Sequence, residues 1–120
     1  MYEIVVEHTF AAAHALRNYN GKCENVHGHN YRVQVGLEGA KLGEDGLLYD
    51  FTELKKRLRA TSEYLDHRFI NELKPFDSIN PSAENIAKFI FDEIQREIAP
   101  VELAYVRVWE TDTSCAIYRP

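Results

Sequence analysis

The clearest secondary-structure signal in the chain is the run Tyr31-Arg32-Val33-Gln34-Val35-Gly36-Leu37-Glu38. Tyr31, Val33, Val35 and Leu37 alternate with other residues and therefore share one face of an extended segment. This pattern predicts a β-strand with one buried face and one wetter face.

A second strand is predicted before this run and a helix after it. Residues 2 to 13 are rich in β-branched and aromatic types, which favour a strand. Asp50 and Glu53 stand at capping-box spacing, where a helix is predicted to begin. Its apolar stripe is Leu54, Leu58 and Leu65.

The second half of the chain predicts one more helix and two short strands. Ser82 is expected to cap a helix that runs to about Ala99, where Pro100 ends it. Strands are expected over 105–109 and 116–118. The order strand, strand, helix, helix, strand, strand predicts an α+β fold, with both helices on one face of a four-stranded, mainly antiparallel sheet. Such a sheet has two open edges, and pairing between subunits is one way to cover them.

Length and composition narrow the class of protein. With 120 residues we expect a single domain over residues 1–120. The net charge is -5 and no basic run is present, so no nucleic-acid partner is expected. No apolar stretch approaches the roughly 20 residues that span a bilayer, so no membrane partner is expected either. Only two cysteines are present, which fits a reducing cytoplasm.

Three of the five histidines lie within sixteen residues, at His14, His27 and His29. Residues two apart in an extended segment project to the same face, so His27 and His29 can point at one ion. His14 can meet them from the neighbouring strand of a hairpin. Three imidazoles with an open fourth position describe a catalytic zinc site. Iron and copper also accept imidazole, and a surface loop with unrelated histidines is the alternative.

The chain holds two cysteines, of which Cys23 could be a metal ligand, a reactive thiolate or an inert thiol. Cys23 precedes His27 by four residues, and it is either a fourth ligand that seals a structural zinc site or a thiolate beside the metal. A buried, inert thiol is the remaining alternative, and that is the interpretation we give to Cys115 in its apolar strand.

Asp66, His67 and Glu110 complete the candidate chemistry. His67 titrates near neutral pH, and Asp66 could orient it. Adjacent helical residues do not face the same way, so this pair must lie at a helix end or in a turn, where a solvated helix terminus is the alternative. Glu110, near the end of a predicted strand, could accept paired hydrogen bonds from an amino-imino edge, or it is simply a charged strand residue.

Together these segments resemble the 6-pyruvoyl-tetrahydropterin synthase family, which includes bacterial 6-carboxy-tetrahydropterin synthases. The resemblance covers nearly the whole chain in the expected order. It is carried by 10–14 (Phe-Ala-Ala-Ala-His), 23–31 (Cys-Glu-Asn-Val-His-Gly-His-Asn-Tyr), 50–55 (Asp-Phe-Thr-Glu-Leu-Lys), 65–67 (Leu-Asp-His), 80–85 (Asn-Pro-Ser-Ala-Glu-Asn) and 109–111 (Trp-Glu-Thr).

The resemblance implies a zinc enzyme that acts on dihydroneopterin triphosphate. By this analogy the zinc ligands are His14, His27 and His29, the catalytic base is Cys23, and Asp66 and His67 form a proton relay. Glu110 would anchor the pterin's amino-pyrimidine edge. Ser82 and Glu84 match a pterin-pocket segment, from which Ala83 departs. Lys22, Arg17 and Arg68 are the candidate cations for the triphosphate.

The implied fold is the tunnelling fold, in which subunit sheets join into a barrel. The family usually forms a hexamer of two trimers, with active sites between subunits. The first expected product is 6-carboxy-tetrahydropterin with release of acetaldehyde, as in queuosine biosynthesis.

Glu24 introduces an alternative product. A related subfamily has a Glu at this place in lieu of the Cys and cleaves the side chain to 6-hydroxymethyl-dihydropterin for folate synthesis. That activity is the second expectation, and formation of 6-pyruvoyl-tetrahydropterin is the third. Glu24 as a mere loop acid remains open, as does a non-catalytic metal-binding or pterin-binding module. Such a module would keep the histidines but would not need Cys23, Asp66 and His67 together.

Overall fold

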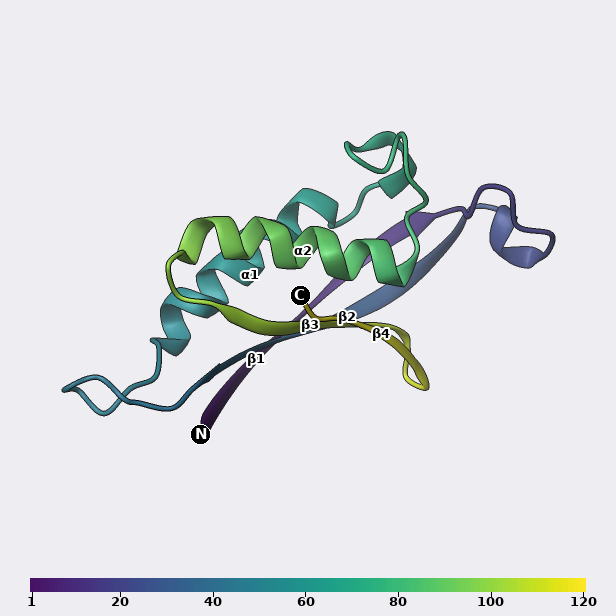
Figure 1. Cartoon of the computed structure of the whole chain (residues 1–120). Coiled ribbons are helices and arrows are strands. Elements are labelled where there is room, and N and C mark those ends of the chain that lie inside the picture. Colours follow the sequence, from purple (N-terminus) through teal and green to yellow (C-terminus); the bar gives the residue numbers. More distant parts are fainter.

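The computed structural model describes residues 1–120 and places two helices on one face of a four-stranded antiparallel sheet (Figure 1). The strands lie side by side in the order β1-β2-β3-β4. The predicted order ββααββ and the predicted fold class are confirmed. The elements are β1 (Tyr2–His14), β2 (His27–Gly39), α1 (Phe51–Leu65), α2 (Ala83–Ile98), β3 (Leu103–Thr111) and β4 (Ser114–Tyr118), with short 3-10 helices η1 (Lys22–Glu24) and η2 (Ile70–Glu72).

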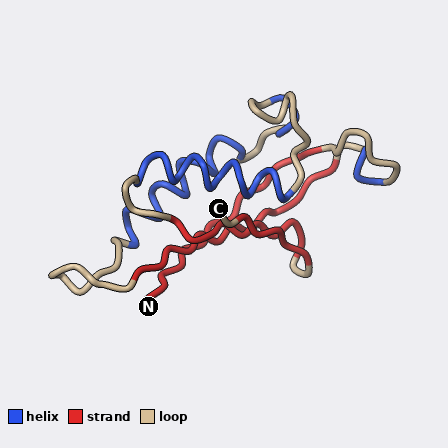
Figure 2. Tube along the Cα trace, viewed as in Figure 1, coloured by secondary structure: helices blue, strands red, loops and turns tan.

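β1 and β2 form a long antiparallel hairpin. They pair continuously from Tyr2 opposite Gly39 to His14 opposite His27. The predicted alternation in β2 holds, since Tyr31 and Val33 are fully buried. The strand begins at His27, four residues earlier than the sequence predicted. The loop end of this hairpin reaches past the N-terminal end of α2 (Figure 2). The histidines lie at this end of the hairpin.

The helices begin and end as their sequences indicate, with one difference. Ser82 caps α2, and its Oγ accepts a hydrogen bond from the backbone N of Asn85. Asp50 caps α1, but its carboxylate accepts from the backbone N of Thr52. The reciprocal capping box predicted with Glu53 does not form, because Glu53 pairs with Arg57 one turn along the helix.

The core lies between the helices and the covered face of the sheet. Leu54 and Leu58 of α1 and Ile90 of α2 are fully buried there. On the other face no helix covers the strands, and the Arg32 guanidinium lies 3.6 Å from the centre of the Trp109 ring. Neither helix has the length and apolar character that crossing a membrane requires.

The chain just after α1 runs along the free edge of β1. His67 donates its backbone N–H to the Ala11 carbonyl at 2.6 Å, and Ala13 donates to the Arg68 carbonyl at 3.0 Å. Ala13 and Phe69 form a parallel bridge. This pairing carries the residues that follow α1 to the histidine end of the hairpin.

Candidate functional site

Three histidines gather at the loop end of the β1–β2 hairpin. His14 ends β1 and lies directly opposite His27, which begins β2, while His29 lies two residues further on the same face. Their ring centroids are 4.5 to 5.2 Å apart. The expected meeting of these three side chains across a hairpin is confirmed.

The hydrogen bonds of two rings fix where their protons lie. His14 Nδ1 is 2.7 Å from the Pro81 carbonyl oxygen, and His27 Nδ1 is 2.7 Å from the Asn25 carbonyl oxygen. A carbonyl only accepts, so both Nδ1 atoms carry hydrogen, and in the neutral rings both Nε2 atoms present lone pairs. These two Nε2 atoms are 2.9 Å apart. Two facing lone pairs repel, so the pair requires a cation, either a proton or a metal ion.

His29 helps to decide between these two cations. Its Nε2 lies 3.0 Å from Oε1 of Glu110, but the contact is not aligned as a hydrogen bond, and this buried nitrogen has no hydrogen-bond partner. Burial lowers the pKa of His29, which favours the neutral ring that metals bind. A proton on His14 would leave His29 Nε2 unpaired, whereas one metal ion can accept all three nitrogens. The donor set therefore fits a metal, and three imidazoles with oxygen suit zinc.

Glu110 of β3 joins the histidines and was not expected among the metal ligands. Its Oε1 lies 3.0 Å from Nε2 of His14 as well as of His29. All four candidate ligand atoms lie within 4.8 Å of one another. The contact with His14 lowers the pKa of Glu110, although burial acts in the opposite direction. The carboxylate is therefore ionised, and it can serve as a fourth ligand or as an acceptor for a substrate.

Asp66 and His67 contact each other at the end of α1, the kind of position that the sequence predicted for this pair. Asp66 is the C-cap residue, and His67 adopts the left-handed conformation with φ 57°. The turn lets the adjacent side chains meet, with Asp66 Oδ2 3.0 Å from His67 Nδ1. Asp66 Oδ1 accepts the backbone N–H of Ala11 at 3.0 Å. This N–H, and secondly His67, hold the pKa of Asp66 below its ordinary value.

His67 lines a cavity at the edge of β1, and of the three clustered histidines only His29 contributes to its lining. Its volume is about 540 Å³, and His29, His67 and Arg68 are among its lining residues. Cys23 and Glu24 do not line it. They lie in η1, in the loop between β1 and β2, where Cys23 is half-buried and Glu24 is exposed. Within one chain, Cys23 therefore does not share this cavity with His67.

The expected pterin-binding residues separate into two groups. Glu84 and Glu110 line one cavity of about 310 Å³, together with Cys115. The Ser82 hydroxyl is occupied in capping α2. Cys115 is exposed, so the expectation that it is buried is wrong. It pairs with Trp109, on the sheet face opposite to buried Val108, and β4 is an edge strand.

The three candidate cations for a triphosphate also differ in availability. The Arg17 guanidinium donates to the carbonyls of Ile79, Asn71 and Phe76 at 3.1, 3.3 and 2.8 Å. It is therefore engaged in holding backbone. Arg68 is exposed and lines the cavity beside His29, and Lys22 is exposed in η1. Arg68 is the cation best placed to meet an anion near the histidines.

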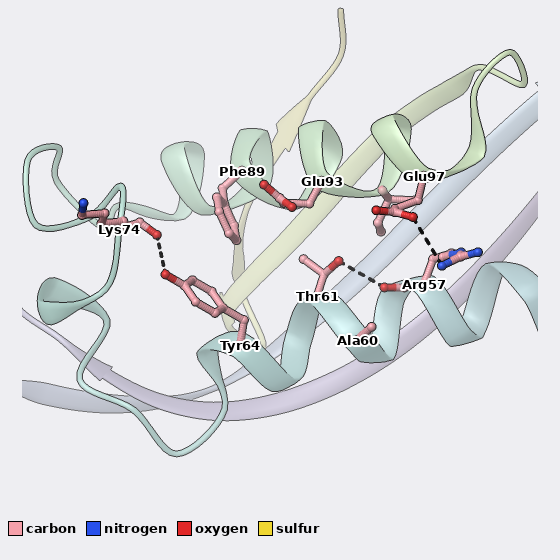
Figure 3. Close-up of a pocket in the computed structure, with 9 residues that line it drawn as sticks. Arg57, Ala60, Thr61, Tyr64, Lys74, Phe89, Glu93 and Glu97 are labelled. Carbon is pink, nitrogen blue, oxygen red and sulfur yellow. Dashed lines mark hydrogen bonds and ion pairs between the residues drawn. The ribbon is translucent and has the colours of Figure 1, made fainter.

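A further cavity of about 430 Å³ lies between α1 and α2 (Figure 3). Tyr64 and Phe89 stack in it with ring centroids 5.8 Å apart, and Arg57 reaches Glu97 across it. Its lining contains no histidine or cysteine. The chemistry therefore belongs to the hairpin end and not to this groove.

Comparisons with known proteins identify a family that the chain resembles over nearly its whole length. The model of the 6-pyruvoyl tetrahydropterin synthase family matches residues 3–120. A 6-carboxy-5,6,7,8-tetrahydropterin synthase from Synechocystis is 37% identical over 123 residues, which cover 98% of this chain and 93% of the relative.

Solved structures of 6-pyruvoyl tetrahydropterin synthases share the fold of this chain. The Caenorhabditis elegans 6-pyruvoyl tetrahydropterin synthase superposes with a TM-score of 0.87 at 29% identity, covering 100% of this chain and 97% of that one. A Plasmodium vivax 6-pyruvoyltetrahydropterin synthase in which a catalytic glutamate is replaced by alanine gives a TM-score of 0.77 at 25% identity, covering 99% and 97%.

Proposed function

The chain belongs to the 6-pyruvoyl tetrahydropterin synthase family, and from that premise we propose that it is a zinc-dependent lyase. Its substrates are 7,8-dihydroneopterin triphosphate and one water molecule, and its products are 6-carboxy-5,6,7,8-tetrahydropterin, acetaldehyde and triphosphate. The observation that carries the proposal is the cluster of His14, His27 and His29, whose nitrogen lone pairs converge while two of the rings are fixed by backbone carbonyls. Metal-binding histidines commonly donate their second N–H in this way.

The metal would be held by His14, His27 and His29, with Glu110 beside them. Zinc bound there would supply Lewis acidity toward the hydroxyls of the substrate's side chain. Backbone contacts at Pro81 and Asn25 orient the first two rings. Because those contacts are made by the main chain, the rings keep their orientation whichever ligand is present.

The remaining residues move protons and hold the pterin. Cys23, as thiolate, removes a proton from the substrate's side chain. His67 gives or takes a proton through Nε2, while Asp66 holds its Nδ1. Glu110 accepts hydrogen bonds from the amino-pyrimidine edge, and Glu84 lines the same cavity. Arg68 meets the triphosphate.

We infer that several copies of the chain assemble and that the active site is completed between neighbouring copies. β1 from Tyr2 to Thr9 and β4 are open sheet edges, and pairing of β1 with β4 of another copy would close a barrel. In one chain Cys23 lies outside the cavity that His67 lines. An assembly of two trimers, with the active site between subunits, would bring Cys23 of one copy next to Asp66 and His67 of its neighbour.

A second candidate activity is cleavage to 6-hydroxymethyl-7,8-dihydropterin. It is favoured by Glu24, which adjoins Cys23 in η1, and by the Plasmodium vivax relative with a catalytic glutamate. Formation of 6-pyruvoyl-tetrahydropterin is the third candidate. A binding module without catalysis is the competing class, and it is disfavoured by the Asp66–His67 contact of 3.0 Å, which such a module would not need.

Product analysis tests the proposal. Purified zinc-loaded protein is incubated with dihydroneopterin triphosphate, and the products are identified by mass spectrometry. Acetaldehyde with 6-carboxy-tetrahydropterin is the expected result. A two-carbon hydroxyaldehyde with 6-hydroxymethyl-dihydropterin would move the assignment to the folate-type activity. No consumption of substrate would favour the binding module.

A further inference from the structure

Three residues directly after His14 lie beyond the end of β1, yet side chains pair the backbone of two of them, Ala15 and Arg17. Asn71 accepts the N–H of Ala15 through Oδ1 at 2.9 Å and donates Nδ2–H to the Ala15 carbonyl at 2.8 Å. Asn80 does the same for Arg17, at 2.8 and 2.9 Å. A carboxamide carries the same donor and acceptor as a peptide, so two side chains replace a neighbouring strand. We call Asn71 and Asn80 the amide clamp.

The residue between the two clamped positions faces the opposite edge. Leu16 donates its backbone N–H to the carbonyl oxygen of Cys23 at 2.7 Å. Alternate residues of an extended chain direct their backbone groups to opposite sides. The segment 15–17 therefore has the amide clamp on one edge and Cys23 on the other.

The clamp is itself anchored to elements that hold the histidines. Asn71 belongs to η2, and the Asn80 carbonyl accepts Nδ2–H of Asn85 in α2 at 2.9 Å. Pro81, the residue after Asn80, offers its carbonyl to His14 Nδ1. A shift of this loop would therefore move both the His14 ring and the segment that carries Cys23.

We propose that Asn71 and Asn80 are positioning residues that set the place of Cys23 relative to the histidine cluster through residues 15–17. The catalytic part of this inference rests on the proposed function of Cys23, whereas the clamp itself does not. Neither asparagine needs to touch the substrate. A displacement of about 1 Å of a reacting group can cost about 100-fold in rate.

Gln95 provides a matched control at the other end of the fold. Its half-buried carboxamide donates to the Val101 carbonyl at 2.7 Å and accepts the N–H of Leu103 at 2.8 Å. Gln95→Ala removes the same two kinds of hydrogen bond, which join α2 to Val101 and to Leu103 at the start of β3, and it leaves the contacts of residues 15–17 unchanged. Its effect on stability should match that of Asn71→Ala.

The test compares Asn71→Ala, Asn80→Ala and Gln95→Ala by two readouts. The first is the ratio of the iodoacetamide alkylation rates of Cys23 and Cys115, measured by peptide mass spectrometry, in which exposed Cys115 is an internal reference. The clamp predicts a changed ratio in both asparagine variants, with faster alkylation of half-buried Cys23, and an unchanged ratio in Gln95→Ala. Equal ratios in all three variants would overturn the proposal.

The second readout is turnover of dihydroneopterin triphosphate. We expect kcat to fall about 100-fold in the asparagine variants with KM nearly unchanged, because orientation and not binding is lost. A fall no larger than in Gln95→Ala would show a purely structural role. If the wild-type protein does not turn over this substrate, the proposed function fails, while the alkylation ratio still tests the clamp. Should an alanine variant not fold, Asn71→Asp and Asn80→Asp keep the acceptor and remove only the donor, and the same alkylation ratio decides.

Discussion

Nε2 of His14 and Nε2 of His27 lie 2.9 Å apart, while the opposite nitrogen of each ring is held by a backbone carbonyl. Neither ring can turn its lone pair away without losing its carbonyl. The backbone of the Pro81 and Asn25 regions therefore preorganises a cation site at the end of the hairpin.

Replacement of Cys23 and of Glu24 should separate the two candidate activities. Cys23→Ala is expected to lower the kcat for 6-carboxy-tetrahydropterin formation by about 10²- to 10⁴-fold, the usual contribution of proton transfer by a positioned side chain. Zinc content should stay unchanged, as measured by elemental analysis. Loss of the carboxy product in Glu24→Ala, with full activity in Cys23→Ala, would reverse the assignment.

Glu110→Gln distinguishes an anchor for the pterin from a metal ligand. As an anchor, Glu110 contributes a hydrogen bond to a charged group, worth about 1.5–3 kcal/mol, so KM should rise about tenfold or more. Zinc affinity should fall little, because three imidazoles remain. Steady-state kinetics and competition with a chelator measure the two effects. A loss of zinc with unchanged KM would make Glu110 the fourth ligand.

The pH dependence of stability reports on Asp66. Its pKa is lowered from the ordinary value of 3.8, first by the N–H of Ala11 and then by His67. A carboxylate with a lowered folded-state pKa stabilises the fold above its unfolded-state pKa, and this contribution is lost as the pH falls through the folded-state value. Asp66→Asn should therefore be less stable than wild type at pH 7, and the difference should shrink below about pH 3.8. Urea titrations at several pH values measure it, and a difference independent of pH would contradict it.

Tyr31→Phe removes a hydroxyl that has no partner. Tyr31 is fully buried and its OH makes no hydrogen bond. The substitution should keep or raise stability by about 1 kcal/mol, because an unsatisfied buried hydroxyl is costly. Tyr105→Phe is the contrasting variant, since the Tyr105 OH donates to Glu3 at 2.8 Å, and it should lower stability. A marked destabilisation by Tyr31→Phe in thermal denaturation would mean that the hydroxyl has a partner.

Local patterns in the sequence predicted the elements and the histidine cluster for clear physical reasons. Alternation in β2 sets which face is buried, and the hairpin then brings His14 opposite His27. The Asp66–His67 pair was predicted at a helix end because neighbouring helical residues diverge, and it lies there. These features depend on residues close in sequence or on a single hairpin.

Features that depend on contacts between residues far apart in the chain could not be predicted from the sequence. Glu110 reaches the histidines only because β3 lies beside β2, and strand order is not encoded in local periodicity. The burial expected for Cys115 was wrong because the residue lies on an edge strand, opposite Trp109. Arg17 was a candidate for binding triphosphate, but its guanidinium meets three carbonyls contributed by residues 54 to 62 positions away.

Metal binding by wild type and by two histidine variants tests the central claim most directly. Zinc is removed with a chelator, and its return is followed by calorimetric titration and by thermal denaturation. One zinc per chain is expected, with a stabilisation of about 2.7 kcal/mol when free zinc is 100 times its dissociation constant. His27→Ala should abolish both effects, whereas His67→Ala, which changes an exposed ring outside the cluster, should keep them. A wild-type chain that takes up no zinc, or a His27→Ala variant that binds it as tightly as wild type, would contradict the metal centre.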